Sequence, residues 1–412
     1  MDVRIKETIT GGKIDAPPSK SYTHRAIVMG FLAEGESEII NPLSSSDTIR
    51  TLEGVKALGA EVENGKIRRG NFRIPDSIIN CGGSGTTLRL LAGISCLLNG
   101  LVVFSGNEAL RKRPMGDLIH ALEGLGARIW SRNGFLPLAT RGGLEGGKVR
   151  VDCAKSSQFL SSLLISLPLA KKDSEIHAEN LKSEPYVEIT VEMLKRFGID
   201  IQKKENTYSI PAHQHYSPQR YEVSGDFSSA SFFMVAGAIT GKKITVGNLD
   251  FQTKQGDRRV VEILKDVGAH VEVSRDSVIV CGGNLSGSKI DCSDNPDLFP
   301  ILSVLGVFAE GETVLYNAPH LHFKESDRIK NMAKELGNLG IPCEERYDGV
   351  RIRGGTVKRN VVVDSHDDHR VCMALSIAAL MSENTIVKNV ECVSESYPHF
   401  FEDLKKVGAV IE

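Results

Sequence analysis

Hydroxyl, glycine and acidic residues gather in six short stretches, each of which opens a run of apolar residues. The stretches are PSKSYTHR, CGGSGTTLR, AKSSQF, SGDFSSA, SDNPDLF and SHDDHR. Basic side chains stand in four of them, namely Lys20, Arg25, Arg89, Lys155 and Arg370. The first turn of a helix offers N–H groups and the positive end of the helix dipole, which bind anions. If the stretches start helices that converge, the sequence predicts a site for small polyanions.

The same residue types are also common N-caps, so any one stretch could be purely structural. Their recurrence at six similar positions, with basic residues at four, favours anion binding. Two further basic clusters are LRKRPMG, over 110–116, and HFKESDRIK, over 322–330. Taken alone, each is typical of a solvated charge run, although arginine forks also suit carboxylates and phosphates.

Two other motifs carry less weight. The run GGLEGGK over 142–148 has the spacing of a phosphate-binding loop, but Val149 follows it where Ser or Thr is required. The cluster His366 to His369 contains possible metal ligands, but no second cluster completes a site. We therefore expect neither a P-loop nor a metal ion.

An internal period positions the six stretches. Six amphipathic segments each end in a glycine, and these glycines are 67 to 72 residues apart: Gly59, Gly126, Gly198, Gly268, Gly340 and Gly408. Apolar residues at steps of three and four predict surface helices, and the glycine predicts a left-handed C-cap. Between them lie six nearly all-apolar segments, predicted as buried helices, that begin near Ser21, Gly85, Ser156, Ser228, Asp297 and Asp368.

One period thus corresponds to a βαβαββ unit, and the chain contains six of them. Because 412 residues exceed what one core usually covers, we expect two α/β domains of three units each. The predicted division is 14–224 for one domain and 1–13 plus 225–412 for the other. The N-terminal strand would then join the second domain.

Composition limits the classes of function. The formal net charge is −2, which gives no general attraction for nucleic acid or anionic membranes. The eight cysteines include no CxxC pair and mostly lie in apolar runs, as reduced thiols do. The sequence shows neither a signal-peptide pattern nor an apolar run long enough to span a bilayer, so we expect a cytoplasmic protein.

Seven motifs in order resemble one enzyme family along the whole chain. They are PSKSYTHRA, GGSGTTLRLLAG, RKRPMGDL, SSQFLSSLL, SGDFSSASFF, FKESDRI and DDHRVCMAL. This set resembles the 5-enolpyruvylshikimate-3-phosphate synthase (3-phosphoshikimate 1-carboxyvinyltransferase) family. The resemblance implies a two-domain inside-out α/β fold with buried parallel helices and an active site in the interdomain cleft. It also implies a monomer that transfers the enolpyruvyl group of phosphoenolpyruvate to the 5-hydroxyl of shikimate 3-phosphate.

The resemblance assigns substrate contacts residue by residue. For shikimate 3-phosphate it implies Lys20, Ser21, Arg25, Ser156, Ser157, Gln158, Ser183, Asp297 and Lys324. For phosphoenolpyruvate it implies Lys20, Gly85, Arg113, Gln158, Arg328 and Arg370. It implies no metal and no cofactor, since fixed cations would offset the charge of both substrates.

The family chemistry requires two proton-transfer groups, because the 5-hydroxyl loses a proton while the methylene carbon of phosphoenolpyruvate gains one. The resemblance assigns Asp297 as the base and Glu325 as the acid, with Lys20 assisting. The acid would need a raised pKa or a protonated fraction near neutrality. One departure is Glu395, which stands where the family usually has a lysine that contacts phosphoenolpyruvate.

Two other functions fit parts of the pattern. The sister enzyme that uses UDP-N-acetylglucosamine usually has Asn after the first lysine and a cysteine in the arginine loop, whereas this chain has Ser21 and no cysteine over 105–116. A non-catalytic anion-binding or RNA-processing protein would not need Lys20, Asp297 and Glu325 together.

Overall fold

The computed structural model describes residues 1–382 and 384–412. The chain forms two compact units, which we call domain 1, Pro18–Val223, and domain 2, Met1–Pro17 with Ser224–Glu412. The first crossing thus follows Pro17 rather than residue 13. The reason is that strand β2 (Gly12–Asp15) pairs in parallel with β15 (Ile244–Gly247), which holds residues 14–17 in domain 2.

Among the described residues, each domain contains three four-stranded sheets. The sheets of domain 1 have the orders β14-β3-β5-β4, β6-β7-β9-β8 and β10-β11-β13-β12. Their strands are β3 (Glu36–Ile40), β4 (Ala60–Glu63), β5 (Lys66–Arg69), β6 (Ile79–Asn80), β7 (Leu101–Ser105), β8 (Ile129–Arg132), β9 (Phe135–Arg141), β10 (Lys148–Asp152), β11 (Ser174–Glu179), β12 (Gln202–Lys204), β13 (Thr207–Ile210) and β14 (Arg220–Glu222).

The sheets of domain 2 have the orders β2-β15-β17-β16, β18-β19-β21-β20 and β22-β23-β1-β24. Besides β2 and β15, their strands are β1 (Val3–Glu7), β16 (Ala269–Val273), β17 (Val278–Gly283), β18 (Lys289–Asp291), β19 (Glu312–Tyr316), β20 (Cys343–Arg346), β21 (Gly349–Arg353), β22 (Val362–Asp364), β23 (Thr385–Lys388) and β24 (Val410–Ile411).

All six sheets share one topology. The first two strands of each order are parallel, and the remaining neighbours are antiparallel. In four sheets a buried helix connects the two parallel strands, whereas in the sheets that contain β2 and β14 the parallel partners come from different passes of the chain. Five surface helices lead into an antiparallel hairpin, and the sixth leads into β24, which pairs with β1. The six predicted βαβαββ repeats are thus confirmed. The chain ends complete domain 2, since β1 lies between β23 and β24 in the last sheet.

The surface helices end as the glycine period predicts. They are α2 (Ser46–Ala57), α5 (Gly116–Gly124), α7 (Glu184–Arg196), α9 (Val260–Asp266), α11 (Arg328–Asn338) and α13 (Phe400–Lys406). The six glycines that follow them have φ between 83° and 110°, the left-handed region. At Gly59 a side chain would also collide with the backbone oxygen of Asn71, so the close return of the chain there requires glycine.

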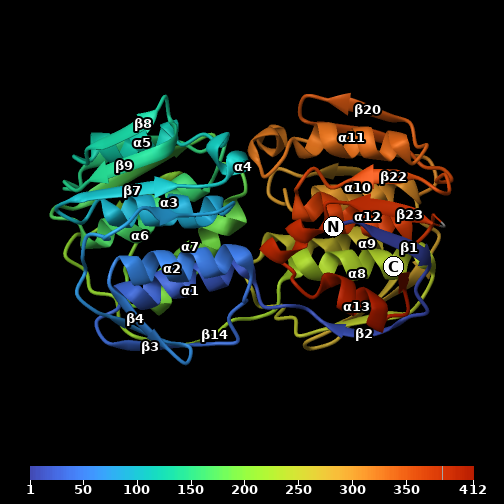
Figure 1. Ribbon diagram of the computed structural model, residues 1–412, viewed down its shortest axis with the longest axis horizontal. Helices are drawn as coiled ribbons and strands as arrows, with labels where there is room; N and C mark the ends of the chain where they lie inside the picture. The colour runs from blue at the N-terminus through green and yellow to red at the C-terminus, as the bar shows by residue number, and fades with distance from the viewer. Residues whose placement is uncertain (383) are drawn as a thin grey trace. The chain divides into compact units, whose positions relative to one another are not determined.

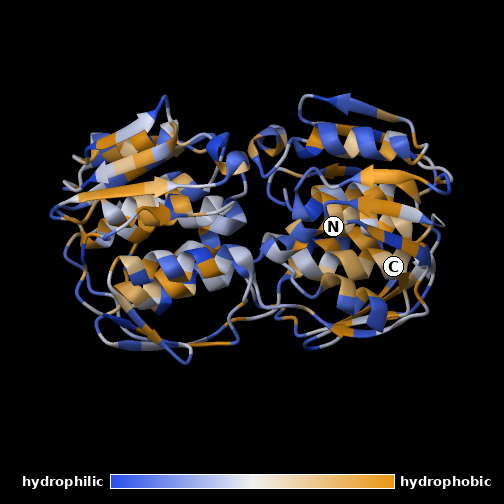
Figure 2. Ribbon diagram, viewed as in Figure 1, coloured by the Kyte–Doolittle hydropathy of each residue, from blue (hydrophilic) through white to orange (hydrophobic). Residues whose placement is uncertain are grey.

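The buried helices form the centre of each domain (Figure 1). They are α1 (Lys20–Leu32), α3 (Gly85–Ser95) and α6 (Gln158–Ser166) in domain 1, and α8 (Phe227–Thr240), α10 (Phe299–Val307) and α12 (His369–Ala379) in domain 2. Figure 2 shows α8 and α10 hydrophobic along most of their length, in contrast to the polar outer face of α11. These six helices are the ones predicted from the apolar runs.

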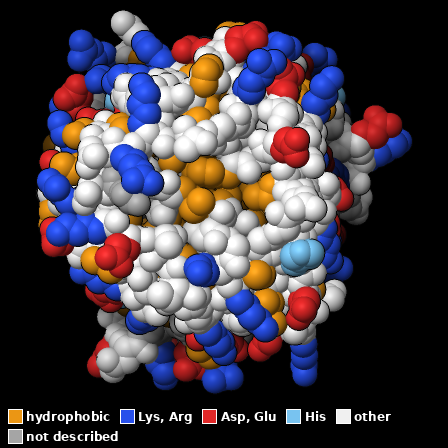
Figure 3. Space-filling model, turned by 90° about the vertical axis from the view of Figure 1, so that its right-hand side faces the viewer, with side chains coloured by type: hydrophobic (Ala, Val, Ile, Leu, Met, Phe, Trp, Pro, Cys, Tyr) orange, Lys and Arg blue, Asp and Glu red, His pale blue; other side chains and the backbone are white. Residues whose placement is uncertain are grey.

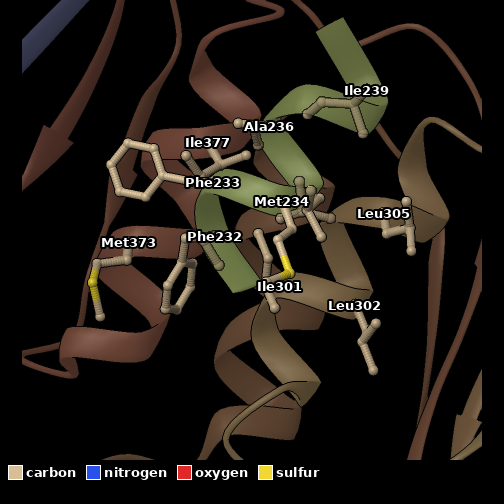
Figure 4. Close-up of a cluster of buried hydrophobic side chains, with 14 of the residues drawn as sticks. Phe232, Phe233, Met234, Ala236, Ile239, Ile301, Leu302, Leu305, Met373 and Ile377 are labelled. Carbon is tan, nitrogen blue, oxygen red and sulfur yellow. The ribbon is translucent and has the colours of Figure 1, made fainter. Parts of the chain in front are cut away.

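Packing between these helices fixes where they begin. In domain 2, Phe233 and Met234 of α8 lie among Ile301 of α10 and Ile377 of α12 (Figure 4). All of these side chains are almost fully buried. Since close-packed interiors resist displacement, the polar first turns of the helices are held at defined positions.

Short elements complete the chain: α4 (Glu108–Arg111) and the 3-10 turns η1 (Leu167–Leu169), η2 (Gly256–Arg259), η3 (Pro319–Phe323) and η4 (Val390–Glu395). Among the described residues, no helix is long and apolar enough to cross a bilayer. On the face of domain 2 shown in Figure 3, side chains of both charge signs are interspersed around a central apolar group.

Candidate active site

In domain 2, one arginine gathers three carboxylates. Arg328 begins α11, and its guanidinium is 1% exposed. Its Nη1 lies 2.7 Å from Asp297 Oδ1, its Nη2 lies 2.8 Å from Glu325 Oε2, and its Nε lies 2.9 Å from Asp368 Oδ2. The two carboxylates predicted to transfer protons are therefore held on one guanidinium.

The same cluster sets the charge of Asp297. Burial alone would raise the pKa of this carboxyl, but Arg370, Arg328 and Lys324 outweigh burial and hold the pKa well below its usual range. Burial opposes the charge of Arg328, yet Asp368, Glu325 and Asp297 keep its pKa well above normal. Asp297 is thus an ionised carboxylate at neutral pH, as a proton acceptor must be.

Asp368 places both arginines, a role that the sequence did not reveal. Its Oδ1 accepts from the backbone N–H of Arg370 at 2.9 Å and so caps α12, while Oδ2 holds Arg328. Arg370 then reaches Asp297, with 3.3 Å between Nη2 and Oδ2. The motif SHDDHR contains the signal for this role, because an aspartate before an apolar helix is a typical N-cap.

Asp257, in η2, is a second buried carboxyl near this cluster. Ser228 Oγ and Asn295 Nδ2 donate to it, the latter at 3.2 Å. Burial and the charge of Asp297 raise the pKa of Asp257 to about 7, so it is partly protonated at neutrality. The sequence contained no signal for a buried carboxyl at this position, because Asp257 becomes buried only when η2 packs against α8 in the folded domain.

In the cluster from His366 to His369, the two histidines pair with different carboxylates. His366 Nε2 pairs with Glu335 at 2.8 Å, and His369 Nδ1 pairs with Glu395 at 2.9 Å. Neighbouring side chains therefore turn to different partners, and no group of three or more possible ligands occurs among the described residues. Glu395 itself, the departure from the family pattern, lies against His369, the first residue of α12.

In domain 1, the predicted residues surround the starts of α1, α3, α6 and α7. Arg25 is 2% exposed, and its guanidinium donates to Thr190 Oγ1 at 2.8 Å and to the backbone oxygens of Tyr186 and Ser21 at 2.9 and 3.0 Å. Burial lowers the pKa of Arg25 to about 10, which leaves it charged at neutral pH. Ser183, the N-cap of α7, adopts a left-handed conformation with φ of 56°.

Gly85 and Arg113 are in direct contact. A Cβ atom at Gly85 would lie 2.7 to 2.9 Å from the guanidinium atoms of Arg113. Beside them, Gln158 donates to Thr86 Oγ1 and accepts from Arg89 Nη1, both at 2.8 Å. Two residues that the family resemblance assigns to one substrate are thus brought together across α3 and the loop after α4.

The N-cap alternative is correct for four of the six buried helices. The side chains of Ser19, Ser84, Asp226 and Asp368 accept from backbone N–H groups of the first turn. At the start of α6, Ser156 Oγ accepts from the backbone N–H of Gln158 at 3.3 Å, whereas Ser157 and Leu298, the residues directly before α6 and α10, make no side-chain cap.

The fold and these two groups of residues define a two-domain α/β protein of six repeats with cations held at buried helix starts. The family model described as EPSP synthase (3-phosphoshikimate 1-carboxyvinyltransferase) matches residues 4–404. A protein of Methanocella arvoryzae named 3-phosphoshikimate 1-carboxyvinyltransferase is 45% identical, with 100% of both chains covered. One of the same name from Methanocaldococcus jannaschii is 41% identical, over 97% of this chain and 96% of that protein.

Solved structures agree with the sequence matches. A structure of EPSP synthase from Acinetobacter baumannii has a TM-score of 0.82 and 29% identity, and the match covers 100% of this chain and 99% of that one. The chain belongs to the EPSP synthase family.

Proposed function

We propose that this protein transfers the enolpyruvyl group from phosphoenolpyruvate to the 5-hydroxyl of shikimate 3-phosphate and releases phosphate. Membership of the family and the names of the full-length relatives support this activity. The main structural support for the roles of individual residues is the cluster in which Asp297 and Glu325 both pair with Arg328.

Three residues move protons in this proposal. Asp297 removes the proton of the 5-hydroxyl as the oxygen attacks C2 of phosphoenolpyruvate, and Glu325 donates a proton to the methylene carbon, with Lys20 assisting. In the elimination, the new methyl group returns a proton to Glu325, and the proton held by Asp297 goes to the oxygen of the leaving phosphate. In the ligand-free cluster, Arg328 and Arg370 weaken Asp297 as a base. A substrate carboxylate that engages these arginines would withdraw that support and strengthen the base.

The remaining residues bind the substrates. Shikimate 3-phosphate contacts Ser21, Arg25, Ser156, Ser157, Gln158, Ser183 and Lys324, besides Lys20 and Asp297. Phosphoenolpyruvate contacts Gly85, Arg113, Gln158, Arg328 and Arg370, besides Lys20. Residues of both domains thus serve one reaction, with fixed cations offsetting the charge of the substrates. We also propose that the protein acts as a monomer, which sedimentation velocity would test.

Acceptor specificity tests the proposed function. Phosphate release from phosphoenolpyruvate would be measured with shikimate 3-phosphate, with UDP-N-acetylglucosamine and with no acceptor. The proposal predicts release with shikimate 3-phosphate alone. Release with UDP-N-acetylglucosamine alone would assign the sister activity, and silence with both acceptors would overturn the proposal.

Gly85→Ala should raise the KM for phosphoenolpyruvate by about 10-fold, because the new methyl group displaces the Arg113 guanidinium and overpacking of this kind costs ~1–3 kcal/mol. Steady-state kinetics at saturating shikimate 3-phosphate measure the effect. Gly116→Ala is the matched control, since Gly116 also begins a helix but a Cβ there meets nothing within 4 Å. Equal KM values for both variants would contradict the assigned contact.

Glu395→Lys should lower the KM for phosphoenolpyruvate several-fold and leave turnover similar, because it replaces a carboxylate that pairs with His369, the residue before Arg370 in the chain, by the cation usual in the family. The same kinetic assay measures it. Glu391→Lys is the control on the same turn, since that residue pairs with the N-terminal amine and is exposed. If both variants retain the KM of the wild type, the side chain at 395 does not face the bound substrate.

A further inference from the structure

The first turn of α2 contacts the starts of two buried helices, although α2 is a surface helix. Asp47 lies in this turn, and its Oδ2 is 3.2 Å from Lys20 Nζ in α1. Both side chains are largely buried, at 8% and 13% exposure. A contact between charged groups in such a place is stronger than one on the surface, because water screens it less.

The backbone of Asp47 reaches the start of α3. Its carbonyl oxygen accepts from Thr87 Oγ1 at 3.4 Å. The same hydroxyl lies 2.8 Å from the oxygen of Ser84, the N-cap directly before Gly85. Asp47 therefore touches, through two different groups, the helix starts that carry Lys20 and Gly85.

A second link runs one turn further along α2. Thr51 Oγ1 lies 2.7 Å from His24 Nδ1 of α1 and 2.6 Å from Thr87 Oγ1 of α3. Burial, together with the charges of Lys20 and Arg25, lowers the pKa of His24 well below normal, so this histidine is neutral. A buried row of directional hydrogen bonds thus joins α1 to α3 through α2, and it restricts how these helix starts can shift.

These contacts bear on Lys20, the lysine that assists proton transfer in the proposed chemistry. A lysine side chain loses rotational freedom when it is held in one conformation. An ion pair with a carboxylate on a fixed helix confines the ammonium before substrate arrives. We infer that Asp47 is a positioning residue that holds Lys20 in register with Gly85 for phosphoenolpyruvate, an inference that rests on the proposed function.

A purely structural role for Asp47 makes a different prediction. An acidic residue in the first turn stabilises a helix through its dipole, and Ser45 with Thr48 already forms a capping box there. In that case a neutral substitution would lower the stability of the protein but leave the KM for phosphoenolpyruvate unchanged.

Asp47→Asn tests the inference because it keeps the shape and removes the charge. We expect the KM for phosphoenolpyruvate to rise about 10-fold, as for the loss of a charge-assisted hydrogen bond. The thermal midpoint, measured in parallel, reports separately the loss of stability that follows from unpairing a largely buried ion pair. Glu53→Gln, which removes an exposed acid of the same helix, is the control and should change neither quantity.

A double-mutant cycle shows whether Asp47 acts through Lys20. In a Lys20→Met background, Asp47→Asn should have no further effect on phosphoenolpyruvate affinity. Affinity is measured for all four proteins by calorimetry with 5-deoxyshikimate 3-phosphate, which lacks the attacking hydroxyl, so that none of them turns over during the titration. The same fold-loss in both backgrounds, or none in either, would overturn the inference.

Two further results separate the possible failures. If Asp47→Asn does not fold, Thr87→Val and Thr87→Ser replace it, and only the valine variant should weaken phosphoenolpyruvate binding. Equal binding by these two variants would also overturn the inference. A wild-type protein that releases no phosphate with shikimate 3-phosphate contradicts the proposed function, whereas an active wild type with an additive cycle contradicts only the role of Asp47.

Discussion

Asp297→Asn should lower turnover by about 100-fold or more, the usual loss when a general base is removed. The amide keeps the size of the side chain and can still contact Arg328, so the cluster should stay assembled. It cannot accept the proton of the 5-hydroxyl. Pre-steady-state and steady-state phosphate release at saturating substrates measure the loss.

Asp294→Asn is the matched control for this variant, because residue 294 lies in the same loop before α10 but is assigned no role in proton transfer. Its turnover should stay close to that of the wild type. Near-normal turnover of Asp297→Asn would remove Asp297 from the chemistry, whereas equal losses in the two variants would indicate a general effect on the loop.

Arg328→Met should lower the free energy of unfolding by about 3–5 kcal/mol at neutral pH, because it leaves carboxylates buried without their common cation. It should also abolish most phosphoenolpyruvate binding. Arg346→Met, which removes an arginine paired with Glu344 at the surface, should change stability by less than about 1 kcal/mol. Urea unfolding of the three proteins gives the comparison.

The difference in free energy of unfolding between the wild type and Arg328→Met should change with pH in a definite direction. The folded pKa of Asp297 is depressed, so its stabilising contribution is present above the ordinary aspartate pKa and is lost as the pH falls through the folded value. Without Arg328, the carboxylates are expected to protonate more readily. The stability gap between wild type and Arg328→Met should therefore be widest at neutral pH and narrow below about pH 4. A gap that widens on acidification would contradict the arrangement around Arg328.

The six-fold repeat could be predicted from the sequence because single residue types and short apolar runs mark its helices. Gly59 and its five counterparts mark helix ends because a left-handed residue is required there, and that requirement is visible in one residue type. Helices such as α10 have no polar face, so their burial was equally plain. The order of the motifs then placed Asp297, Glu325, Arg328 and Arg370 in one domain, where the structure brings them into contact.

Other features depend on packing between distant segments. Asp47 and Asp257 lie in surface elements whose sequences resemble ordinary helix starts, and only the folded domain shows that they reach Lys20 and the surroundings of Asp297. The first domain boundary was placed too early because a four-residue strand, β2, carries little pattern. The possible metal ligands around His366 were adjacent in sequence, but the tight turn there sends their side chains to different partners.

The position of Glu395 was the main discrepancy with the family pattern. Its contact with His369 gives the carboxylate a partner within domain 2, so it is not an isolated negative charge. The departure is therefore compatible with an active enzyme whose phosphoenolpyruvate affinity differs from that of relatives with lysine.

The position of bond cleavage tests the central claim most directly. Phosphoenolpyruvate would be labelled with oxygen-18 at the bridging oxygen between C2 and phosphorus and allowed to react with shikimate 3-phosphate. Mass spectrometry would then locate the label in the products. Enolpyruvyl transfer breaks the C–O bond, so the label should leave with phosphate and the product formed from shikimate 3-phosphate should gain an unlabelled enolpyruvyl group. Label retained in pyruvate, with shikimate 3-phosphate unchanged, would mean cleavage of the P–O bond and would contradict the account.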